Sequence, residues 1–172
     1  MTMKPGELPP EALLDRVQAV EPKHAEGEYE LDFDLLLAVA TEPFPYAWQG
    51  STRETYEPQV LRSWIHLTVI LAHLGRPGHG LEFLIFSETV GHRAAQVLGT
   101  PEKMVVELLP PDRVLRVTGS GRAACHVANS KGIGEDALAG EHLDAKQALS
   151  VIRPYLETGL ITAPWSTREY RY

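Results

Sequence analysis

The stretch PQVLRSWIHLTVILAHL, residues 58–74, constrains the fold of this chain more than any other segment. A proline near its start and Gly75 just past its end are typical of helix termini, so we predict a helix over 58–74. Its apolar side chains occupy most of the circumference, and only Arg62, His66 and His73 form a narrow polar stripe. We therefore expect most of this helix to be buried.

The stretch EYELDFDL, residues 28–35, alternates strictly between acidic and apolar residues. This period of two is the pattern of a half-buried strand. We predict a strand whose apolar side faces the core and whose acidic side faces solvent. The acidic side consists of Glu28, Glu30, Asp32 and Asp34. Residues on one face of a strand lie roughly 6.5–7 Å apart, so the four carboxylates would form a row about 20 Å long.

The length and composition of the chain favour one domain. A chain of 172 residues that is 44% hydrophobic is long enough to bury a core. We interpret residues 1–172 as a single globular domain, with 1–9 and 166–172 as loose termini. The order of the predicted elements indicates a mixed α+β fold with a mostly antiparallel sheet.

The remaining periodic segments predict further helices and strands. With the helix at 58–74 they make about four helices packed on the sheet. The other predicted helices are 10–20, 88–98 after a cap at Ser87, and 143–152. The other predicted strands are 81–86, 103–109, a hairpin at 113–118 and 122–127 around the turn GSG, and 160–165.

Acidic residues are concentrated in the first third of the chain. Residues 1–57 hold twelve acidic and four basic residues, a net charge of −8, whereas 58–172 hold eleven and twelve, a net charge of +1. Nucleic-acid binding depends on clustered Lys and Arg, so this balance argues against it. No apolar stretch reaches membrane-spanning length and no secretory leader is evident. A single cysteine, Cys125, cannot form an internal disulfide. We predict a cytoplasmic protein that binds neither nucleic acid nor membrane.

These patterns favour a small protein-binding module of the inhibitor, immunity or adaptor type. A row of carboxylates with no basic residue among them is electrostatically complementary to a basic protein surface. The aromatic residues Phe44, Tyr46 and Trp48 follow the acidic strand, and aromatic side chains often dominate interface energies. We predict that they anchor the partner beside the acidic row. Each of these interpretations has an open alternative. The acids would simply be the solvated face of a strand, where charge discourages edge-to-edge aggregation. The aromatic residues would fill the core instead of contacting a partner.

A small-molecule enzyme is the alternative function. Its pocket would lie around residues 76–93 and 122–126, with His79 or His92 as the acid or base. An anionic substrate would be held by Arg76, Arg93 or Arg122. A third interpretation is a self-associating structural subunit, a possible homo-oligomer, in which the helix at 58–74 exposes apolar residues.

Metal and thiol chemistry are weakly indicated. His66 and His73 would lie on one helix face but about 10.5 Å apart along its axis, and no His-x-x-x-His spacing occurs. If 122–127 is a strand, Cys125 and His126 point to opposite faces and cannot act as a nucleophile and its base. We therefore predict no metal site and no cofactor.

Overall fold

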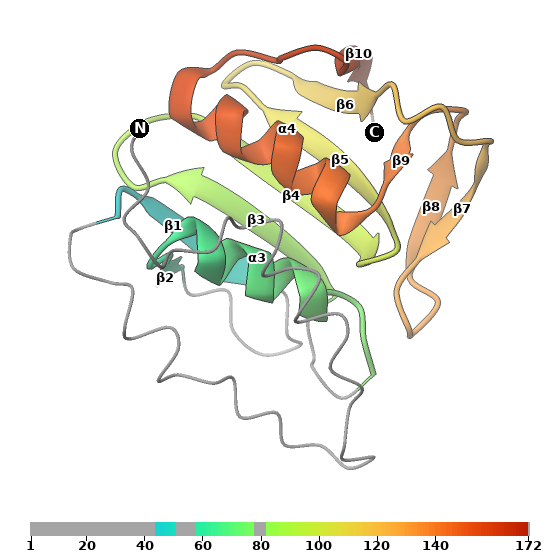
Figure 1. Cartoon of the computed structure of the whole chain (residues 1–172), viewed down its shortest axis with the longest axis horizontal. Helices are drawn as coiled ribbons and strands as arrows, with labels where there is room; N and C mark the ends of the chain where they lie inside the picture. Colours follow the sequence, from blue (N-terminus) through green and yellow to red (C-terminus); the bar gives the residue numbers. More distant parts are fainter. Residues whose placement is uncertain (1–43, 51–57, 78–81, 172) are drawn as a thin grey trace, which may run out of the picture.

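The computed structural model describes residues 44–50, 58–77 and 82–171. Its elements, labelled as in Figure 1, are β1 (Tyr46–Gly50), β2 (Gln59–Val60), α3 (Trp64–His73), β3 (Phe83–Glu88), β4 (Ala94–Thr100), β5 (Lys103–Leu109), β6 (Val114–Thr118), β7 (Cys125–Ala128), β8 (Gly134–Ala137), β9 (His142–Leu143), α4 (Ala145–Thr158) and β10 (Ser166–Tyr170). The main sheet has the order β10-β6-β5-β4-β3-β1-β2, with β9 paired to β5 beside this path. All strand pairs in the described residues are antiparallel.

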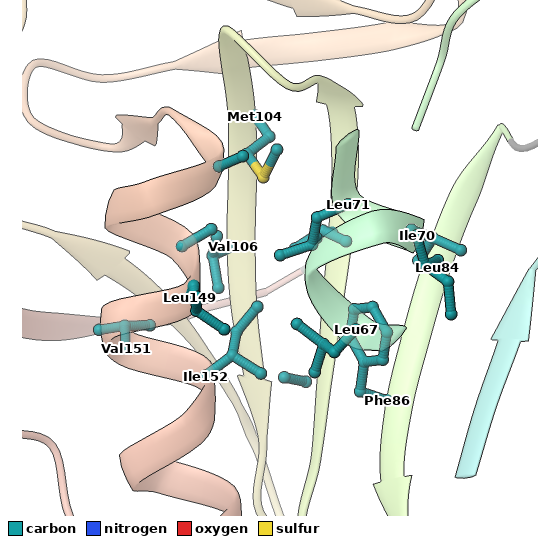
Figure 2. Close-up of a cluster of buried hydrophobic side chains, with 14 of the residues drawn as sticks. Leu67, Ile70, Leu71, Leu84, Phe86, Met104, Val106, Leu149, Val151 and Ile152 are labelled. Carbon is teal, nitrogen blue, oxygen red and sulfur yellow. The ribbon is translucent and has the colours of Figure 1, made fainter. Parts of the chain in front are cut away.

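Both helices, α3 and α4, pack on the same face of the sheet (Figure 1). Figure 2 shows Leu67 of α3, Ile152 of α4 and Phe86 of β3 in one cluster of side chains between the helices and the sheet. Leu67, Phe86 and Ile152 are fully buried. Burial of a side chain of this size stabilises a fold by about 1.5–3 kcal/mol, so this layer is the main core.

The β7–β8 hairpin covers part of the opposite face. Val105 of β5 points away from the helices because its neighbours Met104 and Val106 point toward them. It packs instead with Val127 and Ala137, one from each strand of the hairpin. A second, smaller apolar cluster therefore joins the hairpin to the sheet.

The helix predicted at 58–74 is present as α3 but begins later. Residues 59–60 pair with β1 as the short strand β2. Ser63 then caps the helix, because its Oγ accepts a hydrogen bond from the N–H of His66 at 3.1 Å. Nine of its ten residues are buried, which confirms the predicted burial.

The helix predicted at 143–152 is present as the longer helix α4. Asp144 accepts the N–H of Gln147 at 2.9 Å, and Gln147 accepts the N–H of Asp144 at 3.1 Å. This reciprocal capping box fixes the start of the helix. The helix continues through Pro154 and ends at Gly159, whose φ of 76° lies in the left-handed region that favours glycine.

The prediction of about four helices is wrong. Residues 88–98 form a turn and most of β4 instead of a helix, and the described residues hold only α3 and α4. Ala95 and Val97 of β4 face the helices while Gln96 between them points to the other face. The backbone N–H and C=O groups of this strand form hydrogen bonds with both β3 and β5. The stabilisation from these long-range pairings outweighs the local helix-capping signals at Ser87 and Gly99.

The predicted hairpin at 113–118 and 122–127 is also wrong. β6 pairs with β5 and β10, while β7 pairs with β8. Residues 166–170, expected in a loose terminus, form the edge strand β10, and the segment 160–165 contains no strand. The strands predicted at 81–86 and 103–109 are confirmed as β3 and β5, with a shift of two residues at β3.

Several predictions fall on residues that the structure does not describe. The terminus 1–9, the helix at 10–20 and the acidic strand at 28–35 all lie outside the described residues. The single-domain interpretation stays a prediction. Neither α3 nor α4 is long and apolar enough to cross a membrane.

Candidate functional site

The aromatic residues predicted as anchors lie at the edge of the core. Phe44 and Tyr46 both pack against Trp64, the first residue of α3, with ring centroids 5.0 and 4.9 Å away. Tyr46 is only 8% exposed, and burial, followed by the negative charge of Glu157, raises the pKa of its hydroxyl. Tyr46 is therefore an interior residue, whereas Phe44 keeps part of its surface exposed.

Trp48, the third predicted anchor, contacts the first turn of α3. Its ring meets that of His66 edge to face at 6.2 Å, and part of Trp48 stays exposed. His66 is buried, and its Nδ1 accepts the N–H of Arg62 at 3.1 Å. Burial, aided by the charge of Arg62, lowers the pKa of His66 from 6.5 to about 4. The imidazole is neutral at pH 7 and packs as part of the helix face.

Two of the predicted substrate-binding arginines meet at one turn. Arg76 contacts a carboxylate oxygen of Glu102 at 3.3 Å, and Arg122 donates to the carbonyl of the same residue at 3.3 Å. Arg122 also pairs with Asp144, the cap of α4, at 2.7 Å. These contacts tie the β4–β5 turn to the start of α4. His79, one of the two histidines predicted as acid or base, lies outside the described residues.

Arg93 and His92 lie at the other end of β4. The guanidinium of Arg93 pairs with Glu88, which also accepts the N–H of Arg93 at 3.1 Å. These hydrogen bonds hold the pKa of Glu88 below its usual range. His92 is exposed. Because β4 spans seven residues, about 20 Å separate its ends. The described members of the predicted catalytic set are therefore divided between two places.

A row of polar residues crosses the sheet on the face opposite the helices. Gln96, Glu107, Arg116 and Arg168 are successive cross-strand neighbours on β4, β5, β6 and β10. Arg116 is fully buried, and its Nη2 contacts Glu107 at 2.6 Å. Sequence reasoning missed this row, although Glu107 within KMVVELL and Arg116 within VLRVT, each flanked by apolar residues, are a signal for it.

The middle of this row belongs to an ion cluster formed by Glu107, Arg116, Glu135, Glu141 and Arg168. Arg116 reaches Glu135 of the hairpin at 3.0 Å and stacks on the Tyr170 ring at 3.9 Å. Glu141 lies 3.9 Å from Arg116 and pairs closely with Arg168. The cluster thus joins the hairpin and β10 to the centre of the sheet.

Electrostatics keep the central groups of the cluster charged. Burial alone would lower the pKa of Arg116, but the hydrogen bonds and charges of Glu107 and Glu135 raise it above its ordinary value. Burial would raise the pKa of Glu141, yet hydrogen bonds from Arg168 and from the Leu138 N–H hold it below its ordinary value. These side chains therefore stay charged and are poorly suited to proton transfer. Their role is structural: their ion pairs hold the strands together.

Cys125 and His126 point to opposite faces of the hairpin. Cys125 packs against the smaller apolar cluster, while the exposed His126 lies 2.8 Å from Asp136. This arrangement confirms that the two residues do not form a nucleophile and base pair. Within the described ranges, no three His, Cys, Asp or Glu side chains lie close enough together to hold a metal ion.

Charge is divided unequally between the described part of the chain and the segment before it. The described residues hold twelve basic and eleven acidic side chains, a net charge of +1. Residues 1–43 hold three and ten, a net charge of −7. Comparison with known proteins adds no function: no family matches this chain, and no curated protein or solved structure matches it significantly.

Proposed function

We propose that this protein is a small cytoplasmic binding module that engages a basic protein surface. The contact is the acidic row of Glu28, Glu30, Asp32 and Asp34. The exposed parts of Phe44 and Trp48 lie ten and more residues further along the chain and extend the contact with apolar surface. An inhibitor, immunity or adaptor protein would use such a surface to recognise its target.

The unequal distribution of charge along the chain is the observation that supports this proposal most strongly. Residues 1–43 have a net charge of −7, and the 117 residues that the structure describes have a net charge of +1. A concentrated negative potential attracts a basic surface and speeds its association. The attraction acts over about 8–10 Å at ordinary ionic strength, so it belongs to the segment that carries the charge.

The pairing of the predicted substrate-binding arginines further supports a binding role. Arg76, Arg93 and Arg122 each contact a carboxylate of this chain. Each pair occupies part of the guanidinium's five N–H donors and offsets its positive charge, which weakens its attraction for an anionic substrate. The enzyme alternative therefore has less support than the binding module.

Affinity capture with three versions of the full chain tests the proposal. The baits are the natural chain, the triple variant Glu30→Ser, Asp32→Ser and Asp34→Ser, and a control with the same charge change elsewhere. The control is Asp112→Ser, Asp136→Ser and Glu169→Ser, since the structure places these acids at exposed positions. Captured proteins are identified by mass spectrometry from a lysate of the source organism at low and at high salt.

The proposal expects a basic protein that the natural chain and the control retain at low salt and release at high salt. The acidic-row variant should retain at least about tenfold less of it, through slower association. Equal retention by the acidic-row variant, or retention that salt does not weaken, would reject the proposal. Circular dichroism of the three baits establishes that their folds are the same.

A further inference from the structure

Two buried polar side chains are neighbours on the sheet face that carries the β7–β8 hairpin. β4 pairs along the whole of one edge of β5, so β6 and β9 share the other edge. On that edge Arg116 lies opposite Glu107, and His142 lies opposite Val105. Glu107 and Val105 are two residues apart on β5. Their two partners therefore point to the same face as the hairpin, with backbones roughly 6.5–7 Å apart.

Arg116 has one nitrogen without a hydrogen-bond partner in the described part of the chain. Its Nε and Nη2 donate to Glu107, and Nη2 also reaches Glu135, but the buried Nη1 meets no acceptor within the described ranges. Oε2 of Glu141 lies 3.9 Å from Nη1, which is too far for a direct hydrogen bond. That oxygen accepts the N–H of Leu138 at 2.8 Å, and a carboxylate oxygen can accept a second donor.

His142 also has a buried ring nitrogen that lacks a partner among the described residues. The residue is 8% exposed, and its Nε2 lies 3.0 Å from the carbonyl oxygen of Ala123. A carbonyl oxygen only accepts, so Nε2 carries the hydrogen, and in the neutral ring Nδ1 is an acceptor. In the part of the chain that the structure describes, nothing donates to this buried Nδ1. Buried polar atoms are almost always paired, so two exceptions side by side indicate a ligand that both can bind.

We propose that this place is the site of one buried water molecule, held by Arg116 Nη1, Glu141 Oε2 and His142 Nδ1. A separation of more than 3.5 Å between polar atoms is typical of a contact through water. One water oxygen about 2.8–3.0 Å from both Nη1 and Oε2 fits their separation of 3.9 Å. Buried waters form about three hydrogen bonds, and three protein atoms are offered here.

The donor and acceptor roles of these atoms select water over an ion. Arg116 Nη1 can only donate, whereas Glu141 Oε2 and His142 Nδ1 accept. An anion cannot donate to the two acceptors, and a metal ion cannot accept from the guanidinium. Water accepts once and donates twice, so it satisfies all three atoms. It thereby extends the ion cluster to β9, the strand that carries His142.

A high-resolution crystal structure of the full chain tests the site directly. It should show a water oxygen within about 2.7–3.2 Å of Arg116 Nη1, Glu141 Oε2 and His142 Nδ1. An ion at this place, or a direct hydrogen bond between Nη1 and Oε2 with no water, would overturn the proposal.

Two variants of His142 test the role of its Nδ1 in solution. His142→Asn keeps an acceptor near the position of Nδ1, His142→Leu removes it, and both lose the hydrogen bond to Ala123. Magnetic relaxation dispersion of the solvent, measured on the full chain cross-linked in a gel, gives the residence time of buried water. The natural chain and His142→Asn should give the same time. His142→Leu should shorten it by about tenfold, because the water loses one of its hydrogen bonds.

A second histidine and a check of folding complete the comparison. His126→Leu changes an exposed histidine and should leave the residence time unchanged. Equal times in all variants, or equal shortening in His142→Asn and His142→Leu, would reject the bond from water to Nδ1. Circular dichroism establishes that the variants are folded. If His142→Leu does not fold, the crystal structure of the natural chain decides by itself.

Discussion

Acid should destabilise this protein through His66. The His66 ring is 8% exposed, contacts Trp48, and accepts the N–H of Arg62 at 3.1 Å through Nδ1. Burial and the nearby Arg62 charge disfavour the imidazolium, which lowers the pKa from 6.5 to about 4. Protonation must therefore disrupt the packing at the first turn of α3.

The direction and the size of the change in the free energy of unfolding follow from the two pKa values of His66. In the unfolded chain His66 titrates near 6.5 and in the folded protein near 4. Between these pH values the unfolded chain binds a proton that the folded chain does not. The free energy of unfolding is therefore unaffected by His66 above pH 6.5 and falls as the pH drops toward 4. Each pKa unit corresponds to about 1.4 kcal/mol, so the loss reaches at most about 3 kcal/mol.

Urea denaturation from pH 7.5 to 4 measures this loss when the natural chain is compared with His66→Asn. The asparagine amide oxygen can replace Nδ1 as the acceptor for the Arg62 N–H, but it does not titrate. The natural chain should lose up to about 3 kcal/mol more than the variant over this range. His126→Asn, which changes an exposed histidine, should follow the natural chain. Parallel pH profiles for the natural chain and His66→Asn would refute the reasoning.

Two further predictions concern the ion cluster and α4. Arg116→Met should cost about 3–5 kcal/mol because it leaves the buried Glu107 without its cation. Adding Glu107→Leu should recover part of this cost in urea denaturation, and additive losses would contradict the pairing. Asp144→Ala removes the capping box and should cost about 1–2 kcal/mol. Asp144→Asn keeps a cap acceptor and should lose less than half as much, and equal thermal shifts for the two variants would argue against the cap.

The helices that were predicted correctly carry their signals locally. α4 has a capping box at Asp144 and a left-handed Gly159 at its end, and both features act within one turn of the helix. α3 has an apolar circumference that fits only a buried helix. The local sequence did not predict that residues 94–100 form the strand β4, because this strand depends on pairing with β3 on one side and β5 on the other. The cap-like Ser87 and Gly99 are then part of β3 and of β4.

The ion cluster could be suspected but not located from the sequence. Glu107 and Arg116 are nine residues apart and meet only because of the register between β5 and β6. Arg168 joins them from the far end of the chain through β10. A lone charge in an apolar strand signals a buried partner, but the identity of that partner depends on strand order. The periodicity of apolar residues in the sequence does not reveal strand order, so it could not identify the partner.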